Sequence, residues 1–248
     1  MTFNFNKLIE KPKNNNTLIV DALNLAFRWK HQAKLNFIED YVQTVLSFAN
    51  SYNCSNIIIT ADQGSSKEFF VEYERCLNVL SKLHPVIRFD ETEADDLAAY
   101  IVKKKEAFNL GDIVLISSDR DWDLLIQDGV MRFSYVTRKE VTMENWGEHY
   151  DVPREQYACF KCLTGDKGDN VPGYAGIGPK RAAILLQEYE SAYNIYDSVP
   201  IEGKFKYLQE INNNPDRILR NYELMDLLTY CEDAIGSKNC SEIDRRLS

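Results

Sequence analysis

Nine acidic residues stand where their carboxylates could gather at one site. Three of them follow apolar runs: residues 18–20 lead into Asp21, residues 57–61 into Asp62, and residues 113–118 into Asp119. A single Asp after a strand is more often a turn residue or a helix cap, but three in series favour a shared site. The full set is Asp21, Asp62, Glu93, Asp95, Asp96, Asp119, Asp121, Asp166 and Asp169.

Such a gathering of carboxylates predicts bound cations. Two carboxylates about 4 Å apart repel by roughly 4 kcal/mol at an effective dielectric constant near 20. The site must therefore raise the pKa values of its acids or bind positive charge. An all-oxygen ligand set favours Mg²⁺ or Mn²⁺ over zinc. Two neighbouring ions of this kind suit in-line attack of water on a phosphodiester.

Two of the acidic segments also have simpler interpretations. Residues 92–96 (TEADD) could form a capping box, with Thr92 as the N-cap and Asp95 three residues later. Three acids within four residues exceed what capping requires, and Glu93 and Asp96 would share a helix face. Residues 165–170 (GDKGDN) could be a solvated turn.

The first part of the chain alternates buried strands with helices. β-branched apolar runs predict strands at 18–20, 57–59 and 113–116, with a weaker one at 86–89. Helical spacing lies between them, at about 38–50, 67–82 and 93–107. A short β element at 131–136, a turn near 138–139 and a return through Val141 follow. This series predicts an α/β fold with a mainly parallel central sheet flanked by helices.

From about residue 153 the pattern becomes helical. We expect helices at 154–163, 180–189, 203–211 and 216–227. The predicted domains are therefore an α/β metal-binding core over 1–150 and a helical lobe over 151–248.

The most specific segment is residues 171–182 (VPGYAGIGPKRA), within a hairpin at about 163–190. Gly176, Ile177 and Gly178 make a tight turn whose backbone can approach a ligand, and Pro179 suits the first helical position. The helix N-terminus with Lys180 and Arg181 then forms an anion site. A plain glycine-rich linker is the weaker alternative, because turn, proline and basic pair occur together. We expect the hairpin to bind the phosphate backbone of DNA and to make no sequence-specific contacts with the bases.

Composition excludes several classes of protein. The 248 residues carry 29 basic and 38 acidic side chains, no apolar run approaches the roughly 18 residues of a membrane span, and the N-terminus has no signal-peptide core. A charge of −9 alone argues against nucleic acid, but without the nine site acids the remaining 29 acids equal the 29 bases. Six scattered cysteines indicate an intracellular protein. Cys159 and Cys162 favour a reduced thiol pair over a zinc or redox site.

These motifs, taken in order, resemble the 5′-nuclease superfamily of flap endonucleases, phage 5′→3′ exonucleases and the 5′-nuclease domain of bacterial DNA polymerase I. The resemblance rests on residues 21–24 (DALN), 93–96 (EADD), 118–121 (SDRD), 165–170 (GDKGDN) and 176–182 (GIGPKRA), and covers roughly residues 17–230. It implies a PIN-like core, a helix-hairpin-helix-type (H3TH) DNA-binding motif, and a role in DNA replication.

The resemblance also implies roles for individual residues. Asp21, Asp62, Glu93, Asp95 and Asp119 would bind the first divalent metal, Asp121, Asp166 and Asp169 the second, and Asp96 either. Arg28 and Lys161 would lie near the scissile or adjacent phosphates, and K⁺ would bind at the hairpin. The substrate would be branched or nicked duplex DNA with a 5′ end, extending to RNA–DNA hybrids. We expect a monomer without membrane contact, in the cytoplasm of a bacterium or of a phage-infected host.

Two features depart from the family. Arg120 stands where many relatives have Gly. Relatives carry a basic, Tyr-rich helical arch between the positions of Asp62 and Glu93, where this sequence has only thirty residues. Lys67 is the nearest substitute for the phosphate-binding lysine of the arch.

Two other functions fit part of the sequence. A non-catalytic DNA junction-binding protein would need only the hairpin, and would gain nothing from a repulsive acidic pocket beside DNA. A PIN-like ribonuclease would share the acids at the strand ends, and the hairpin disfavours it.

Overall fold

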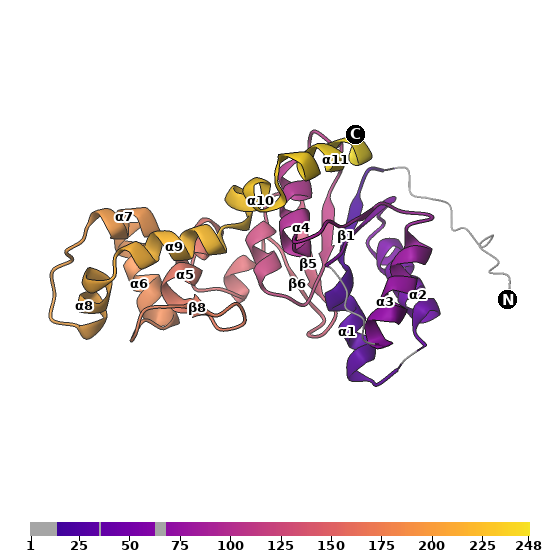
Figure 1. Cartoon of the computed structure of the whole chain (residues 1–248). Helices are drawn as coiled ribbons and strands as arrows, with labels where there is room; N and C mark the ends of the chain where they lie inside the picture. Colours follow the sequence, from indigo (N-terminus) through magenta and orange to yellow (C-terminus); the bar gives the residue numbers. More distant parts are fainter. Residues whose placement is uncertain (1–13, 35, 63–67) are drawn as a thin grey trace. The chain divides into compact units, whose positions relative to one another are not determined.

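The computed structural model describes residues 14–34, 36–62 and 68–248, and forms two compact units (Figure 1). The first unit contains the chain up to Glu140 together with residues 231–248, and the second contains residues 141–230. Lys67, predicted to bind DNA, lies outside the described residues.

The first unit is built on a six-stranded sheet in the order β3-β2-β1-β4-β5-β6. Neighbours from β3 to β5 are parallel. The strands are β1 (Thr17–Asp21), β2 (Asn56–Thr60), β3 (Val86–Ile87), β4 (Ile113–Ile116), β5 (Val130–Ser134) and β6 (Lys139–Val141). All five residues of β1 are buried, which explains its unbroken apolar run. The predicted mainly parallel sheet is confirmed, with β3 two residues shorter than the expected 86–89.

Helices cover both faces of this sheet. They are α1 (Ala22–His31), α2 (Ile38–Ser51), α3 (Glu68–Leu80), α4 (Ala94–Lys103) and α11 (Ser237–Leu247), with α10 (Leu227–Ile235) crossing the boundary between units. Helices α1 to α3 share one apolar core with alternate strand residues such as Val20, Ile59 and Ile116. Helix α4 lies on the opposite side of the sheet (Figure 1). The helix Ala22–His31 had no counterpart among the predicted elements.

The C-terminal helices belong to the sheet unit, which differs from the predicted division at residue 150. Three contacts hold them there. The Arg246 guanidinium donates to the Val86 carbonyl at 3.1 Å, and the Tyr100 hydroxyl donates to Asp244 at 2.7 Å. Lys103 pairs with Glu232 at 2.9 Å. The predicted helical lobe 151–248 therefore loses its last 18 residues to the first unit and gains residues 141–150.

The second unit is mainly helical, as predicted. Its helices are α5 (Tyr157–Thr164), α6 (Pro179–Tyr189), α7 (Ala192–Asp197), α8 (Lys206–Asn213) and α9 (Asp216–Met225), with a two-stranded antiparallel pair β7 (Gly165–Asp166) and β8 (Val171–Pro172). The buried Asn221 side chain ties α5 to β8, because its amide donates to the carbonyls of Cys162 and Pro172, each at 2.9 Å. All six cysteines are buried free thiols, and Cys159 and Cys162 lie on α5, the helix on which the pair was expected. Within the described ranges, every helix is too short or too polar to cross a membrane.

Candidate metal centre and phosphate-binding hairpin

Asp21 ends β1 and is almost completely buried, with 4% of its surface exposed. Its Oδ1 accepts from the Asn24 backbone N–H at 3.2 Å, so it also caps α1, and its Oδ2 accepts from the Ser117 hydroxyl at 2.6 Å. Burial, with a smaller contribution from the charges of Asp62 and Asp119, raises the pKa of Asp21 to about 7, although these two hydrogen bonds lower it. Asp21 therefore has an environment in which a bound cation would stabilise the ionised carboxylate.

Asp62, just after β2, fixes the start of α4. Its Oδ1 accepts from the Ala94 backbone N–H at 2.9 Å, while Glu93 at the N-cap position makes no side-chain cap. The alternative interpretation of residues 92–96 as a capping box is not borne out, because the Thr92 hydroxyl donates to the Asp90 carbonyl and the N-cap position is Glu93. An acid from one strand thus caps the helix that carries the next acids.

Helix α4 supplies Asp95 and Asp96 from its first turn. Burial raises the pKa of Asp95 well above its ordinary value, and the charges of Asp21, Asp119 and Asp62 add to this effect. The Trp122 indole N–H opposes it by donating to Asp95 at 2.6 Å. Burial and then the Glu93 charge raise the pKa of Asp96 to about 6. Glu93 itself is exposed.

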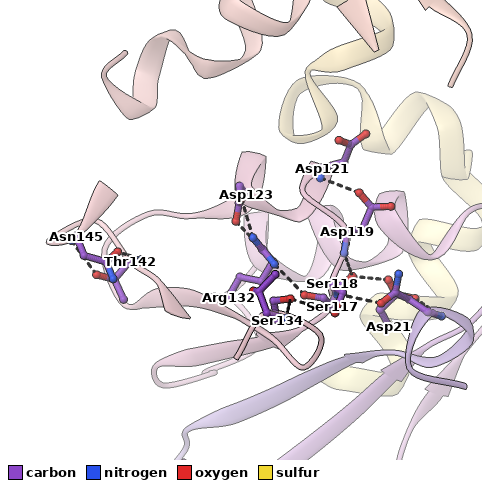
Figure 2. Close-up of polar contacts among 12 residues, drawn as sticks. Asp21, Ser117, Ser118, Asp119, Asp121, Asp123, Arg132, Ser134, Thr142 and Asn145 are labelled. Atoms are coloured by element: carbon purple, nitrogen blue, oxygen red, sulfur yellow. Dashed lines mark hydrogen bonds and ion pairs between the residues drawn. The ribbon is translucent and has the colours of Figure 1, made fainter. Parts of the chain in front are cut away.

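Asp119 and Asp121 lie after β4 (Figure 2). The Asp119 N–H donates to the Ser117 hydroxyl at 3.0 Å, and its own Oδ1 accepts from the Asp121 N–H at 3.0 Å. Asp121 begins the short 3₁₀ helix η1 (Asp121–Leu125) and is half-buried. The loop is thereby held in a turn that presents both carboxylates at the carboxyl edge of the sheet.

The residues of this cluster fit hard divalent cations. Their donors are all carboxylate oxygens, as Mg²⁺ and Mn²⁺ prefer. Among the described residues, no Lys or Arg forms an ion pair with Asp21, Asp62 or Asp95, although their charges repel one another. Cations are the simplest means of offsetting that repulsion.

Arg28 is the basic residue of α1 predicted to meet a phosphate. Its side chain is half-buried, and its guanidinium lies 5.5 Å from the centre of the Trp29 ring. Burial and the Asp21 charge raise the pKa of Tyr135 to about 12, and the charge of Arg28 opposes that rise. Arg28 and Asp21 are therefore both close enough to Tyr135 to shift its pKa, in opposite directions.

Asp166 and Asp169 belong to the second unit, where Asp166 ends β7 and Asp169 lies in the turn between β7 and β8. They offer carboxylate oxygens within 4.8 Å of each other. Lys161 is buried, and its ammonium pairs with Asp166 at 3.0 Å. Partial burial alone would raise the pKa of Asp166, but the hydrogen bond and charge of Lys161 lower it. Lys161 thus has a partner within the protein and keeps a predicted metal ligand ionised.

The glycine hairpin is held by close backbone contact. Gly165, at a φ of +73°, lies so near Gly173 that a Cβ there would stand 2.2 Å from the Gly173 nitrogen. Ile177 is buried and anchors the turn, whereas Gly176 and Gly178 are exposed. Pro179 occupies the first turn of α6 after Gly178 at the N-cap, as predicted.

Two basic residues follow in the same turn of α6. Lys180 and Arg181 are exposed, and no acid lies in this turn. Arg181 donates to the Gly176 carbonyl at 2.5 Å and lies 5.0 Å from the centre of the Tyr207 ring. Cations at the positive end of a helix are unfavourable for the isolated protein, so their placement favours an anionic ligand.

Several residues of the metal centre were missed from the sequence. Ser117 and Trp122 donate to the acids directly and belong to none of the motifs, whereas Asn24, the last residue of the 21–24 motif, donates to Asp21 through its backbone N–H. Asp123 continues the alternation of Asp119 and Asp121, but it is fully buried and pairs with Arg132. The spacing of acids could have drawn attention to Asp123, whereas nothing local indicates its partner.

The chain is similar to known nucleases over most of its length. The family model described as "5′-3′ exonuclease, C-terminal SAM fold" matches residues 152–244. The flap endonuclease of Escherichia phage T5 is 35% identical over 95% of this chain and 91% of its own length. DNA polymerase I of Caldicellulosiruptor bescii is 38% identical over 46% of this chain and 14% of the polymerase.

Solved structures agree with these relatives. A T5 protein co-crystallised with metal ions matches with a TM-score of 0.88 and 33% identity, over 94% of this chain and 98% of the other. A T5 flap endonuclease in a pseudo-enzyme–product complex with DNA and metal ions matches with a TM-score of 0.87 and 33% identity, over 94% and 97%. The catalytic core of Rad2 with DNA substrate, at 15% identity and a TM-score of 0.56, supports the fold alone.

Proposed function

The chain belongs to the superfamily of 5′-nucleases that includes flap endonucleases and 5′-3′ exonucleases, and on this premise we propose that it is a divalent-metal-dependent nuclease acting on DNA. It hydrolyses phosphodiester bonds at branched or nicked duplexes with a 5′ end, as a structure-selective 5′-flap endonuclease and 5′→3′ exonuclease.

One observation carries the proposal: carboxylates from the ends of β1, β2 and β4 and the start of α4 lie close enough that the charges of Asp62 and Asp119 help to raise the pKa values of Asp21 and Asp95. Divalent ions bound there would activate water and stabilise charge on the phosphate. In our proposal Asp21, Asp62, Glu93, Asp95 and Asp119 hold the first ion, Asp121, Asp166 and Asp169 hold the second, and Asp96 supports either.

The chain's own residues bind and orient the substrate. The exposed N–H groups at the start of α6, with Lys180 and Arg181, bind the duplex backbone and leave the bases unread. Arg28 contacts a phosphate near the carboxylates. Lys161, paired with Asp166, acts by keeping that carboxylate ionised rather than by reaching a phosphate from solvent.

Finer features are part of the same proposal. The ions are Mg²⁺ or Mn²⁺, which the oxygen donors favour. K⁺ binds at the hairpin turn, where peptide carbonyls are hard donors. The product carries a 5′-phosphate, RNA–DNA hybrids are cleaved during primer removal, and the active species is a cytoplasmic monomer. The buried free thiols are compatible with a reducing compartment.

The test uses a labelled 5′-flap and a nicked duplex with Mg²⁺. The wild-type protein should cleave both, and EDTA should stop it. Asp119→Asn combined with Asp121→Asn should abolish cleavage and largely retain DNA binding. Turnover by this double variant would contradict the metal centre, and cleavage restricted to RNA would favour a ribonuclease.

A further inference from the structure

A chain of hydrogen bonds runs from a buried ion pair to the carboxylates of the metal centre (Figure 2). The Arg132 guanidinium, on β5, donates to both oxygens of Asp123, at 2.5 and 2.8 Å. Its remaining nitrogen donates to the Ser117 carbonyl at 3.0 Å. Arg132 is 5% exposed, and Asp123 and Ser117 are fully buried, so water does not compete for these bonds.

Ser117 connects two acids that lie 98 positions apart in the sequence. Its hydroxyl proton is donated to Asp21 Oδ2 at 2.6 Å, and its oxygen accepts the Asp119 N–H at 3.0 Å. A hydroxyl can donate one hydrogen bond and accept others at the same time. Ser117 can therefore donate to Asp21 while it accepts from the Asp119 N–H, and the reverse arrangement is not possible because a backbone N–H only donates. The end of β1 and the loop after β4 are therefore joined through a single side-chain oxygen.

We propose that Ser117 is a positioning residue of the nuclease site, and that Arg132, locked by Asp123, fixes Ser117 in its place. This inference rests on the proposed function. Among the described residues, each Asp21 oxygen accepts from one donor, Asn24 or Ser117, so lone pairs remain for a cation. Ser117 thus orients the Asp21 carboxylate without competing for its coordination capacity, as outer partners of metal ligands do.

The neighbouring hydroxyl supplies a matched control. Ser118 accepts from the Ser134 hydroxyl at 3.1 Å and from the Val136 N–H at 3.2 Å, and these bonds lead away from the acids. Ser117→Ala and Ser118→Ala remove the same oxygen from adjacent positions. Ser117→Thr keeps the hydroxyl and tests whether that group, rather than the shape of the residue, is responsible.

Two readouts are independent of cleavage. Calorimetric titration with Mn²⁺, without DNA, should show at least about tenfold weaker binding in Ser117→Ala, near wild-type binding in Ser117→Thr, and no change in Ser118→Ala. In the metal-free protein, the Asp119 amide should exchange its hydrogen faster in Ser117→Ala than in Ser118→Ala or wild type. A higher Mg²⁺ requirement for cleavage should accompany both effects.

The positioning role of Ser117 and the proposed nuclease activity can fail independently in these experiments. Unchanged Mn²⁺ affinity and Asp119 exchange in Ser117→Ala would overturn the positioning role, as would an equal loss in Ser118→Ala. A wild-type protein that binds Mn²⁺ and cleaves no DNA would contradict the nuclease activity and leave the positioning role standing.

Discussion

The Asp62 carboxylate accepts a hydrogen bond from the backbone N–H of Ala94 at 2.9 Å. Asp62 follows β2 and Ala94 begins α4, so this contact fixes the start of the helix beside the strand end. The same helix turn carries Asp95 and Asp96. A predicted metal ligand therefore also holds its neighbours in position.

Because Asp62 also caps α4, two substitutions of Asp62 should lower the free energy of unfolding by different amounts. Asp62→Asn keeps an oxygen that can accept from Ala94, whereas Asp62→Ala loses the cap. We expect Asp62→Ala to be less stable than Asp62→Asn by about 1 kcal/mol, the usual worth of an N-cap. Urea unfolding in EDTA measures this difference. Equal stabilities would show that the contact contributes nothing to the fold, whatever happens to cleavage.

In the metal-free protein, the contribution of Asp21 to stability should fall as the pH rises. The unfolded chain ionises Asp21 near its ordinary pKa of 3.8, but the folded protein does so only near pH 7. The contribution of Asp21 to the free energy of unfolding should therefore be highest below about pH 4, fall until about pH 7, and then level off. For one carboxyl group, the fall is about 1.4 kcal/mol for each pH unit between the unfolded and folded pKa values.

Asp21→Asn should remove part of that slope in chemical denaturation with EDTA between about pH 4.5 and 8, a range that spans most of this fall. Divalent metal should restore stability to the wild-type protein most strongly at the upper end of the range, where the carboxylates are ionised. A wild-type slope retained in Asp21→Asn would show that Asp21 is not the group responsible.

The Asp123–Arg132 pair should behave as one unit. Asp123→Ala leaves Arg132 buried without its partner, which typically costs about 3 to 5 kcal/mol. Asp123→Leu combined with Arg132→Met removes both charges and should cost clearly less. Urea unfolding of this double variant and of its component single variants, Asp123→Leu and Arg132→Met, gives the coupling energy. Simple addition of the two single effects would contradict a direct pair.

The hairpin should contribute charge to DNA binding. Lys180→Ala combined with Arg181→Ala should weaken duplex binding and reduce the slope of log K against log salt concentration by about 2, because each phosphate contact contributes about 0.9. Fluorescence anisotropy at several salt concentrations measures both quantities. Lys238→Ala is the control, because Lys238 is an exposed cation in the first turn of α11 outside the hairpin. An unchanged slope in the double variant would place the DNA elsewhere.

The strands and the acids that follow them could be predicted because the information is local. The runs before Asp21, Asp62 and Asp119 are apolar at successive positions, and the structure places them as adjacent parallel strands. The carboxyl ends of parallel strands share one edge, so these acids were expected together. Helix α1 was missed although Ala22, Leu25, Ala26 and Trp29 follow helical spacing and are buried.

The sequence by itself determined which residues could be ligands, their order, the parallel sheet and the glycine turn before α6, since residue chemistry and periodicity are properties of neighbouring positions. Only the tertiary structure decided that Ser117 joins Asp21 to Asp119, that Arg132 lies beside β4, and that the last helix returns to the sheet unit. Those contacts depend on strand register and on burial. Burial is also the main cause of the raised pKa values of Asp21 and Asp95, because an ionised carboxylate loses favourable hydration where water is excluded.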